Sequence, residues 1–198
     1  TYIGSGAFNG INKLESIVLP YVGNEINDSG YYGVFGYIFG NISSSSTEAI
    51  KQEYGSSSGD YVYYYIPKTL RTVTITRDTG ISYGAFYNCS FLTEINIPDT
   101  VTQIDSNAFE NCSGITDFII PESVDSLGSY CFNGCSNLKQ INIPDGVTTL
   151  GEGAFYSCSN LESITLPFVG SQINASEKYA VFGYIFGYGT GNRDTTAT

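Results

Sequence analysis

Residues 92–114 read LTEINIPDTVTQIDSNAFENCSG, and residues 115–137 read ITDFIIPESVDSLGSYCFNGCSN. The two stretches have the same length and place similar residues at equivalent positions. The residue types that mark these positions recur every 23 residues, at Phe86, Phe109, Phe132 and Phe155, at Pro98, Pro121, Pro144 and Pro167, and at Cys89, Cys112, Cys135 and Cys158. A fixed period of roughly 20 to 50 residues is the signature of a solenoid whose coils stack on one another. The repeat therefore predicts a solenoid.

Each unit follows the pattern L-x-x-I-x-I-P-x-x-V-x-x-I-x-x-x-A-F-x-x-C. The alternation in Ile95-Asn96-Ile97 predicts a strand that turns its isoleucines to the core and Asn96 to water. Pro98 ends that strand where its missing N–H does least harm. The A-F-x-x-C spacing predicts a single helical or 3₁₀ turn that points Phe and Cys inward. Since one coil cannot bury these side chains alone, we expect neighbouring coils to share them.

One coil is much longer than the unit. Leu14 and Leu70 occupy equivalent positions 56 residues apart, which is 33 more than one period. We interpret this as a coil with two insertions, at about 23–33 and at the serine-rich stretch 41–59. The second insertion is expected to be a surface excursion, and the tyrosine-rich segment 61–67 is expected to lead back into the next strand. Val34 and Phe39 keep the five-residue spacing of the Ile and Phe positions.

A longer repeat overlies the shorter one. Residues 14–40 return as residues 161–187, at an offset of 147. We therefore predict that residues 1–198 form one solenoid, with an enlarged coil at about 21–67, regular coils at about 68–167 and the start of a second enlarged coil at 168–198. Because terminal repeats normally need polar caps and neither end has one, we expect a fragment of a longer protein.

Composition excludes several classes of function. The net charge is −11, and the eight basic residues are scattered, which argues against nucleic-acid binding. Histidine is absent, so the usual general base and the commonest metal ligand are both missing. No run approaches the 18 or so apolar residues of a membrane span. We expect no cofactor, no metal and no membrane span in this segment.

The cysteine column allows three interpretations. Equivalent positions in stacked coils lie about 4.8 Å apart, within reach of a disulfide, but their Cβ atoms point in parallel rather than toward each other. Without histidine or a C-x-x-C pair, a zinc site is poorly supported. We predict buried free thiols that pack as small apolar groups, with Cys131 in the alanine position.

Catalysis has little support. Asp78-Thr79-Gly80 has the letters of an aspartic-protease site, but that chemistry needs two carboxylates that share one proton, which this segment alone does not supply. A turn between two coils explains the segment as well. Glu94 and Asp117 lie on adjacent predicted strands, as glycosidase carboxylates do, but the repeat alone accounts for their spacing. We therefore predict that the chain is not an enzyme.

Two surfaces are candidates for recognition. The first is the row of outward positions on the predicted strands, whose members are Thr74, Glu94, Asn96, Asp117, Ile119, Gln140, Asn142 and Thr165. Such a row suits an extended protein or glycan contact, but it is equally typical of a solvent-facing sheet. The second consists of Tyr61, Tyr63 and Tyr65, since tyrosine provides a broad amphipathic contact at low entropic cost. Alternatively, these tyrosines pack the inserted coil against its neighbours.

The unit resembles that of the BspA-like leucine-rich repeat proteins, with nine positions recurring in phase over about 130 residues. The resemblance implies a right-handed leucine-rich-repeat-type solenoid (a β-rich α/β fold) with one parallel strand per coil on its concave face. It also implies secreted or cell-surface display and adhesion. We therefore expect an extracellular interaction module that binds a protein, such as a host or matrix protein, through the concave sheet or the inserted loops. The alternative is a glycan-binding module that uses the exposed tyrosines and the Thr/Asn ladder.

Overall fold

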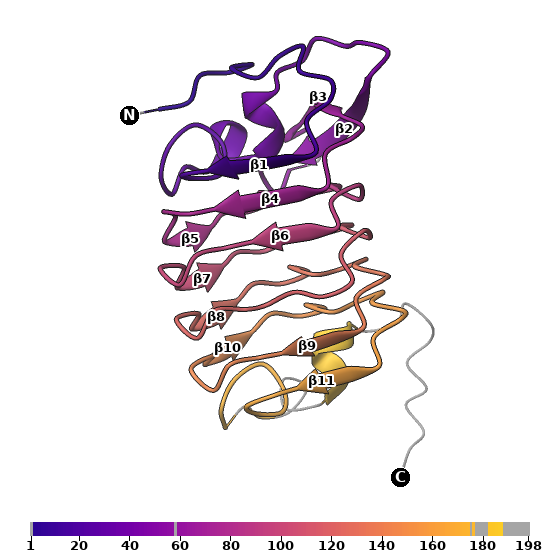
Figure 1. Cartoon of the computed structure of the whole chain (residues 1–198). Coiled ribbons are helices and arrows are strands. Elements are labelled where there is room, and N and C mark those ends of the chain that lie inside the picture. Colours follow the sequence, from indigo (N-terminus) through magenta and orange to yellow (C-terminus); the bar gives the residue numbers. More distant parts are fainter. Residues whose placement is uncertain (1, 58, 175, 177–181, 188–198) are drawn as a thin grey trace.

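The coils stack in sequence order along one axis (Figure 1). The computed structural model describes residues 2–57, 59–174, 176 and 182–187. One side of the stack carries parallel strands in two groups, β1 (Ser16–Leu19), β4 (Thr72–Ile75) and β6 (Glu94–Asn96), and then β9 (Gln140–Asn142) and β11 (Ser163–Thr165). We call this side the strand face. The solenoid fold is thus confirmed.

The strands pair in register, so that equivalent residues form columns. Ile17 pairs with Val73, which pairs with Ile95, and all three point into the core. The phenylalanines form a parallel column within it: the ring centroids of Phe86 and Phe109 lie 5.5 Å apart, with the ring planes 8° from parallel. Phe132 and Phe155 continue the column at spacings of 5.2 and 5.7 Å. Each ring is therefore buried by the coils above and below it.

The cysteines are free thiols, as predicted, and four of the five are fully buried. Three of them bond to the preceding coil: the thiols of Cys112, Cys135 and Cys158 donate to the carbonyl oxygens of Phe86, Phe109 and Phe132, at 3.1, 3.3 and 3.2 Å. Cys131 is buried in the alanine position. Burial raises the pKa of the Cys158 thiol to about 12, so these groups stay protonated and inert.

The Ala-Phe segments are tight turns rather than helices. Their hydrogen bonds have the 3₁₀ pattern, as where Cys89 N donates to Phe86 O. However, residues with positive φ bracket each turn, such as Gly84 (63°) and Asn88 (62°). Because the left-handed conformation cannot continue a right-handed helix, each turn stops after one round.

The structure corrects the expectation of one parallel strand per coil. A second parallel sheet of two-residue strands runs along another side of the stack, in the order β5 (Gly80–Ile81), β7 (Gln103–Ile104), β8 (Ser126–Leu127) and β10 (Thr149–Leu150). Each regular coil thus contributes a strand to this second sheet. On the strand face, by contrast, the coil of residues 115–137 has only an isolated bridge between Asp117 and Gln140.

Phe118 explains this interruption. It occupies the position that Ile95 and Ile141 hold in the neighbouring coils, and its ring packs at 4.8 Å from Phe109 and 5.0 Å from Phe132. A phenyl ring needs more depth than an isoleucine side chain. We attribute the gap between β6 and β9 to this ring, which is buried between two members of the phenylalanine column.

The enlarged coil is thicker on the phenylalanine side than on the strand face. On the strand face it contributes one strand, β1, which pairs directly with β4. On the other side the 3₁₀ helix η2 (Phe35–Ile38) places two rings in the column: Phe39 lies 6.1 Å from Phe8, and Phe35 lies 5.2 Å from Phe86. Phe39 thus lies in the phenylalanine column, as its spacing from Val34 indicates, and Phe35 adds a second ring that contacts the next regular coil.

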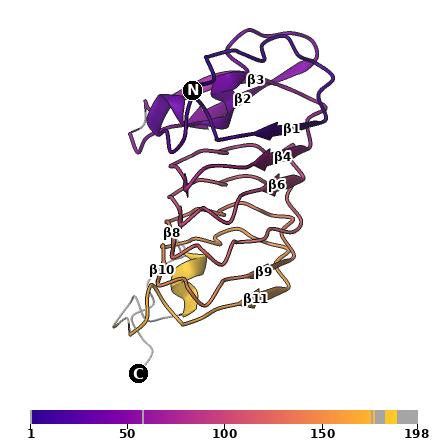
Figure 2. The same cartoon turned by 60° about the vertical axis from the view of Figure 1, so that its left-hand side comes forward.

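The second insertion is not a simple surface excursion. Residues 47–53 form β2 (Thr47–Glu53), which pairs with β3 (Tyr61–Pro67) as an antiparallel hairpin at the end of the stack (Figure 2). Tyr64 and Ile66 of β3 are buried, and so is Gln52 of β2. Gln52 Oε1 accepts a hydrogen bond from Gly36 N at 2.5 Å, and Gln52 Nε2 donates to Tyr87 O at 3.3 Å. The hairpin is therefore joined to both η2 and the next coil.

The second enlarged coil begins with the same contacts as the first. Phe155 N donates to Ile185 O beside η4 (Phe182–Phe186), as Phe8 N donates to Ile38 O. The counterpart of the first insertion lies partly outside the described residues, and the expected second insertion lies wholly outside them. The short 3₁₀ helix η1 (Gly30–Tyr32) completes the elements of the first enlarged coil.

Candidate binding surfaces

The strand face displays two rows of outward side chains. Pairing places Thr74 beside Asn96, and Asn142 beside Thr165. One row consists of Ser16, Thr72, Glu94, Asp117, Gln140 and Ser163, and the other of Val18, Thr74, Asn96, Ile119, Asn142 and Thr165. All of the predicted strand-face residues are exposed except Thr74, which is half-buried.

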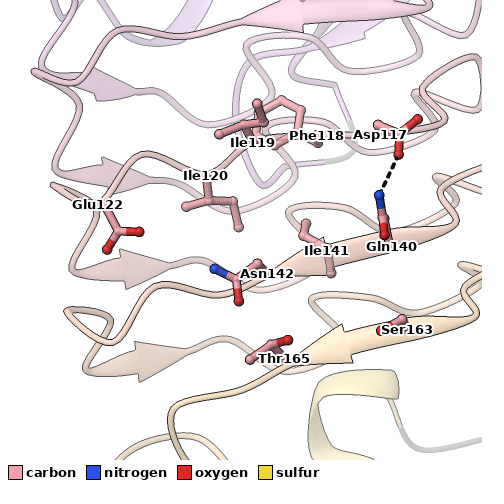
Figure 3. A pocket seen from close by; sticks show the side chains of 10 residues that line it. All are labelled: Asp117, Phe118, Ile119, Ile120, Glu122, Gln140, Ile141, Asn142, Ser163 and Thr165. Carbon is pink, nitrogen blue, oxygen red and sulfur yellow. Dashed lines mark hydrogen bonds between the residues drawn. The ribbon is translucent and has the colours of Figure 1, made fainter.

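The polar members of these rows bond to one another. Asn96 Nδ2 donates to Glu94 Oε1 at 2.9 Å and to Thr74 Oγ1 at 3.4 Å. Gln140 Nε2 donates to Asp117 Oδ1 at 3.3 Å across the interruption (Figure 3). These bonds hold exposed side chains in place, so the face is partly ordered before any partner arrives.

Ile119 is the apolar exception. Its side chain is 85 % exposed at the interruption. It lines a cavity of about 480 Å³ together with Asp117, Gln140, Asn142 and Thr165, which surround it with polar groups (Figure 3). An exposed aliphatic side chain next to polar groups resembles the apolar centre and polar rim of protein interfaces.

The tyrosines lie on the hairpin. Alternation in β3 turns Tyr64 into the core, whereas Tyr61 and Tyr63 are exposed and Tyr65 is half-buried. Tyr61 and Tyr63 contact edge to face, with their centroids 5.9 Å apart. Lys51 Nζ lies 4.3 Å from the Tyr61 centroid. One face of the segment thus packs inward through Tyr64, and the other turns Tyr61 and Tyr63 to water.

The tyrosines and the Thr/Asn ladder do not line the same cavity. Tyr63 lines a second cavity of about 440 Å³ with Asn88 and Asn111, which belong to the Ala-Phe turns and not to the strand face. Asn88 and Asn111 were not predicted as site residues. Their separation of 23 residues indicates that the two amides lie side by side in neighbouring coils. It was interpreted only as part of the structural repeat.

Asp78 has a structural partner instead of a catalytic one. Its buried carboxylate accepts hydrogen bonds from Val22 N at 2.7 Å and from Asn27 N at 3.0 Å. Thr79 N in turn donates to Asn27 Oδ1 at 3.0 Å. Burial raises the pKa of Asp78, while the two N–H donors act against that shift. The Asp-Thr-Gly segment thus fastens the first insertion to the next coil.

Metal and membrane sites were also considered. In the part of the chain that the structure describes, no group of three or more Cys, Asp or Glu side chains is placed to hold a metal ion. Within the same residues, no helix has the length and apolar character that crossing a bilayer requires.

Comparison with known proteins identifies the family. Residues 1–74 and 56–181 match the profile described as a BspA type leucine rich repeat region, with six copies. The chain belongs to the BspA-type leucine-rich repeat family. Leucine-rich repeats are generally protein-interaction modules, and proteins of this family are typically binding scaffolds without enzymatic activity. No curated protein matches the chain.

Three solved structures illustrate the similarity of this BspA-type chain to bacterial proteins. A leucine-rich repeat protein of T. pallidum is 31 % identical, with a TM-score of 0.49 over 50 % of this chain and 47 % of that one. A leucine-rich repeat protein of Bacteroides ovatus is 31 % identical, with a TM-score of 0.48 over 57 % and 32 %. A leucine rich cell surface protein of Faecalibacterium prausnitzii is 22 % identical, with a TM-score of 0.49 over 86 % and 51 %. The chain thus spans about half or less of the length of these proteins.

Proposed function

We propose that this chain is an extracellular, non-enzymatic adhesion module that binds a protein partner through its strand face. The observation that carries the proposal is Ile119, exposed within a polar rim at the interruption of the sheet. Burying that side chain under a partner would contribute about 1.5–3 kcal/mol of binding free energy.

The partner we propose is a host-surface or matrix protein. The strand face offers amides and hydroxyls, together with the carboxylates of Glu94, Asp117 and Glu122. Glu94 and Asp117 each accept a hydrogen bond from a neighbouring amide, which holds these two carboxylates in place. Support for a surface location comes from the family and from the cell-surface protein of Faecalibacterium prausnitzii, which is similar to this chain.

Binding to immobilised matrix proteins tests the proposal. The purified chain is passed over collagen, laminin and fibronectin by biolayer interferometry. Ile119→Asp is expected to weaken binding at least about tenfold, the equivalent of roughly 1.4 kcal/mol. Ile42→Asp is the matched control, because Ile42 is 62 % exposed and lies in the loop before β2, away from the strand face.

Two results would contradict the proposal. Failure to bind any matrix protein argues against adhesion of this kind, and binding that Ile119→Asp and Ile42→Asp reduce equally argues against the strand face. Asn142→Arg, which places a bulky charge beside Ile119, is a second variant for the same surface. Labelling of intact source cells with an antibody to the chain tests the surface location separately.

A further inference from the structure

The cavity beside Tyr63 has the chemistry of a separate small-ligand site. It lies between the outer face of the β2–β3 hairpin and the Ala-Phe turns of successive regular coils. Its volume of about 440 Å³ falls within the range of small-ligand sites, roughly 300–1,000 Å³. It shares no lining residue with the strand-face cavity, so the inference drawn from it does not depend on the proposed protein-binding function.

A short ladder of amides forms one wall. Asn88 and Asn111 hold equivalent left-handed positions, with φ of 62° and 60°. Asn111 Nδ2 donates to Asn88 Oδ1 at 3.0 Å, and Asn88 Nδ2 donates to Lys51 O at 2.8 Å. These bonds fix both amides and leave Asn111 Oδ1 as the acceptor at the open end of the ladder.

The next coil keeps that acceptor accessible. The equivalent position is Gly134, with φ of 71°. A Cβ atom there would lie only 2.4 Å from Asn111 Oδ1, so any side chain would occupy the space in front of the amide. Ser90 and Ser113, which are also one period apart, line the same cavity and add two hydroxyl groups. This wall therefore offers neutral donors and acceptors at fixed positions.

An aromatic ring forms the opposite wall. Tyr63 is 51 % exposed and is held edge to face by Tyr61. Lys51, paired with Tyr63 across the hairpin, directs its ammonium group to Glu53 at 2.9 Å and to the Tyr61 ring. Because this lysine is already paired, the cavity presents no free positive charge to an anionic ligand.

We infer that this cavity binds a neutral sugar unit of a glycan. A pyranose ring has an apolar C–H face that packs on an aromatic ring, and hydroxyl groups around its edge that both donate and accept. The ring of Tyr63 would pack against the apolar face of the sugar. Asn111 Oδ1 and the hydroxyls of Ser90 and Ser113 would form hydrogen bonds with the hydroxyl groups at the edge of the sugar. An anionic ligand would find no free cationic side chain in this cavity. A purely apolar ligand would leave the amide oxygen of Asn111 without a hydrogen-bond donor.

Saturation-transfer NMR on the full chain tests this site. The probes are glucose, galactose, mannose, N-acetylglucosamine and their disaccharides. We expect at least one of them to receive saturation and to bind about tenfold more weakly to Tyr63→Ala, the equivalent of roughly 1.4 kcal/mol. Tyr63→Phe keeps the ring and should retain binding. Tyr32→Ala is the matched control, because Tyr32 is also a 51 % exposed tyrosine but lies in η1, outside the cavity.

Gly134→Asn gives an independent test. Asparagine tolerates the left-handed conformation, but its Cβ would lie 2.4 Å from Asn111 Oδ1, so the Asn111 amide would have to leave its place in the wall. Sugar binding should then disappear while the circular dichroism spectrum remains that of the folded protein. The inference is overturned if none of the sugars binds, if Tyr63→Ala and Tyr32→Ala have equal effects, or if Gly134→Asn binds as the wild type does.

Discussion

Single side chains determine how the coils pack against one another. Phe109 illustrates this, because its ring is fully buried and contacts Phe86, Phe132 and Phe118 at centroid distances of 5.5, 5.2 and 4.8 Å. Every regular coil supplies such a ring at the same place. Stability therefore depends on contacts that cross from coil to coil more than on contacts within one coil.

Truncation of this ring is expected to be costly. Phe109→Ala should lower the free energy of unfolding by roughly 3–5 kcal/mol, since it leaves a cavity between two coils. Urea denaturation followed by circular dichroism measures the change. Tyr2→Ala, at an exposed aromatic residue, is the control. A loss below about 1 kcal/mol would be incompatible with the observed burial.

Periodicity determined which single residues could be predicted. The phenylalanines and cysteines were placed correctly in the core because each recurs at the same position in every coil. Phe35 was not predicted, because the repeat has one phenylalanine position per coil and gives no signal for a second ring four residues before Phe39. Gln52 was missed because a lone polar residue in a serine-rich stretch carries no periodic signal, and only the folded hairpin shows that it is buried.

Among the elements, the β2–β3 hairpin depends on Gln52. This side chain satisfies Gly36 N and reaches Tyr87 O and Cys89 Sγ. It therefore connects three segments: the hairpin, the 3₁₀ helix η2 and the first regular coil. The inward face of β3 supplies the apolar part of the same junction through Tyr64 and Ile66.

Replacement of this glutamine tests the junction. Gln52→Leu should reduce stability by about 1–3 kcal/mol, because it leaves the buried Gly36 N–H without an acceptor. Hydrogen exchange should show the loss first in residues 47–53 and 61–67. Gln140→Leu, at an exposed glutamine of the strand face, serves as the control. If the hydrogen-exchange rates of the hairpin are unchanged in this variant, its apolar face alone is sufficient to keep the hairpin packed on the solenoid.

The hairpin also shows which elements could not be predicted from the sequence. The strand at 61–67 was foreseen as a return to the solenoid, but its antiparallel partner was not. The serine-rich composition of residues 41–59 favours a loop, and only pairing with the tyrosine-rich strand makes residues 47–53 a strand. Similarly, the short second sheet was missed because two-residue strands give no alternation to detect.

The whole molecule carries a net charge of −11, and several of its carboxyl groups are partly buried. Burial raises the pKa of Asp78, Asp105 and Glu110 above their ordinary values. For Glu110, amide donors from Asn133 and Asn107 act against that shift. The folded state therefore binds protons more tightly at these groups than the unfolded state does.

Stability should consequently rise on mild acidification. A raised folded-state pKa favours folding below that pKa, and this contribution is lost as the pH rises through it. Reduced repulsion among the acidic groups acts in the same direction. We expect urea midpoints, measured at constant ionic strength, to increase as the pH falls from 7 toward about 4, the ordinary pKa of Asp and Glu side chains. Glu110→Gln should flatten the profile more than Asp99→Asn, an exposed control of equal charge change. A midpoint that falls over this range would contradict the pKa directions.

The unequal thickness of the enlarged coil has a consequence for the direction of the stack. One strand on one side faces two rings on the other, so the coils before and after residues 14–69 cannot remain parallel. The contacts that start this arrangement recur at Phe155 and Ile185, 147 residues after their first occurrence. An enlarged coil of this kind thus tilts the coils on its two sides against each other, with no flexible joint required.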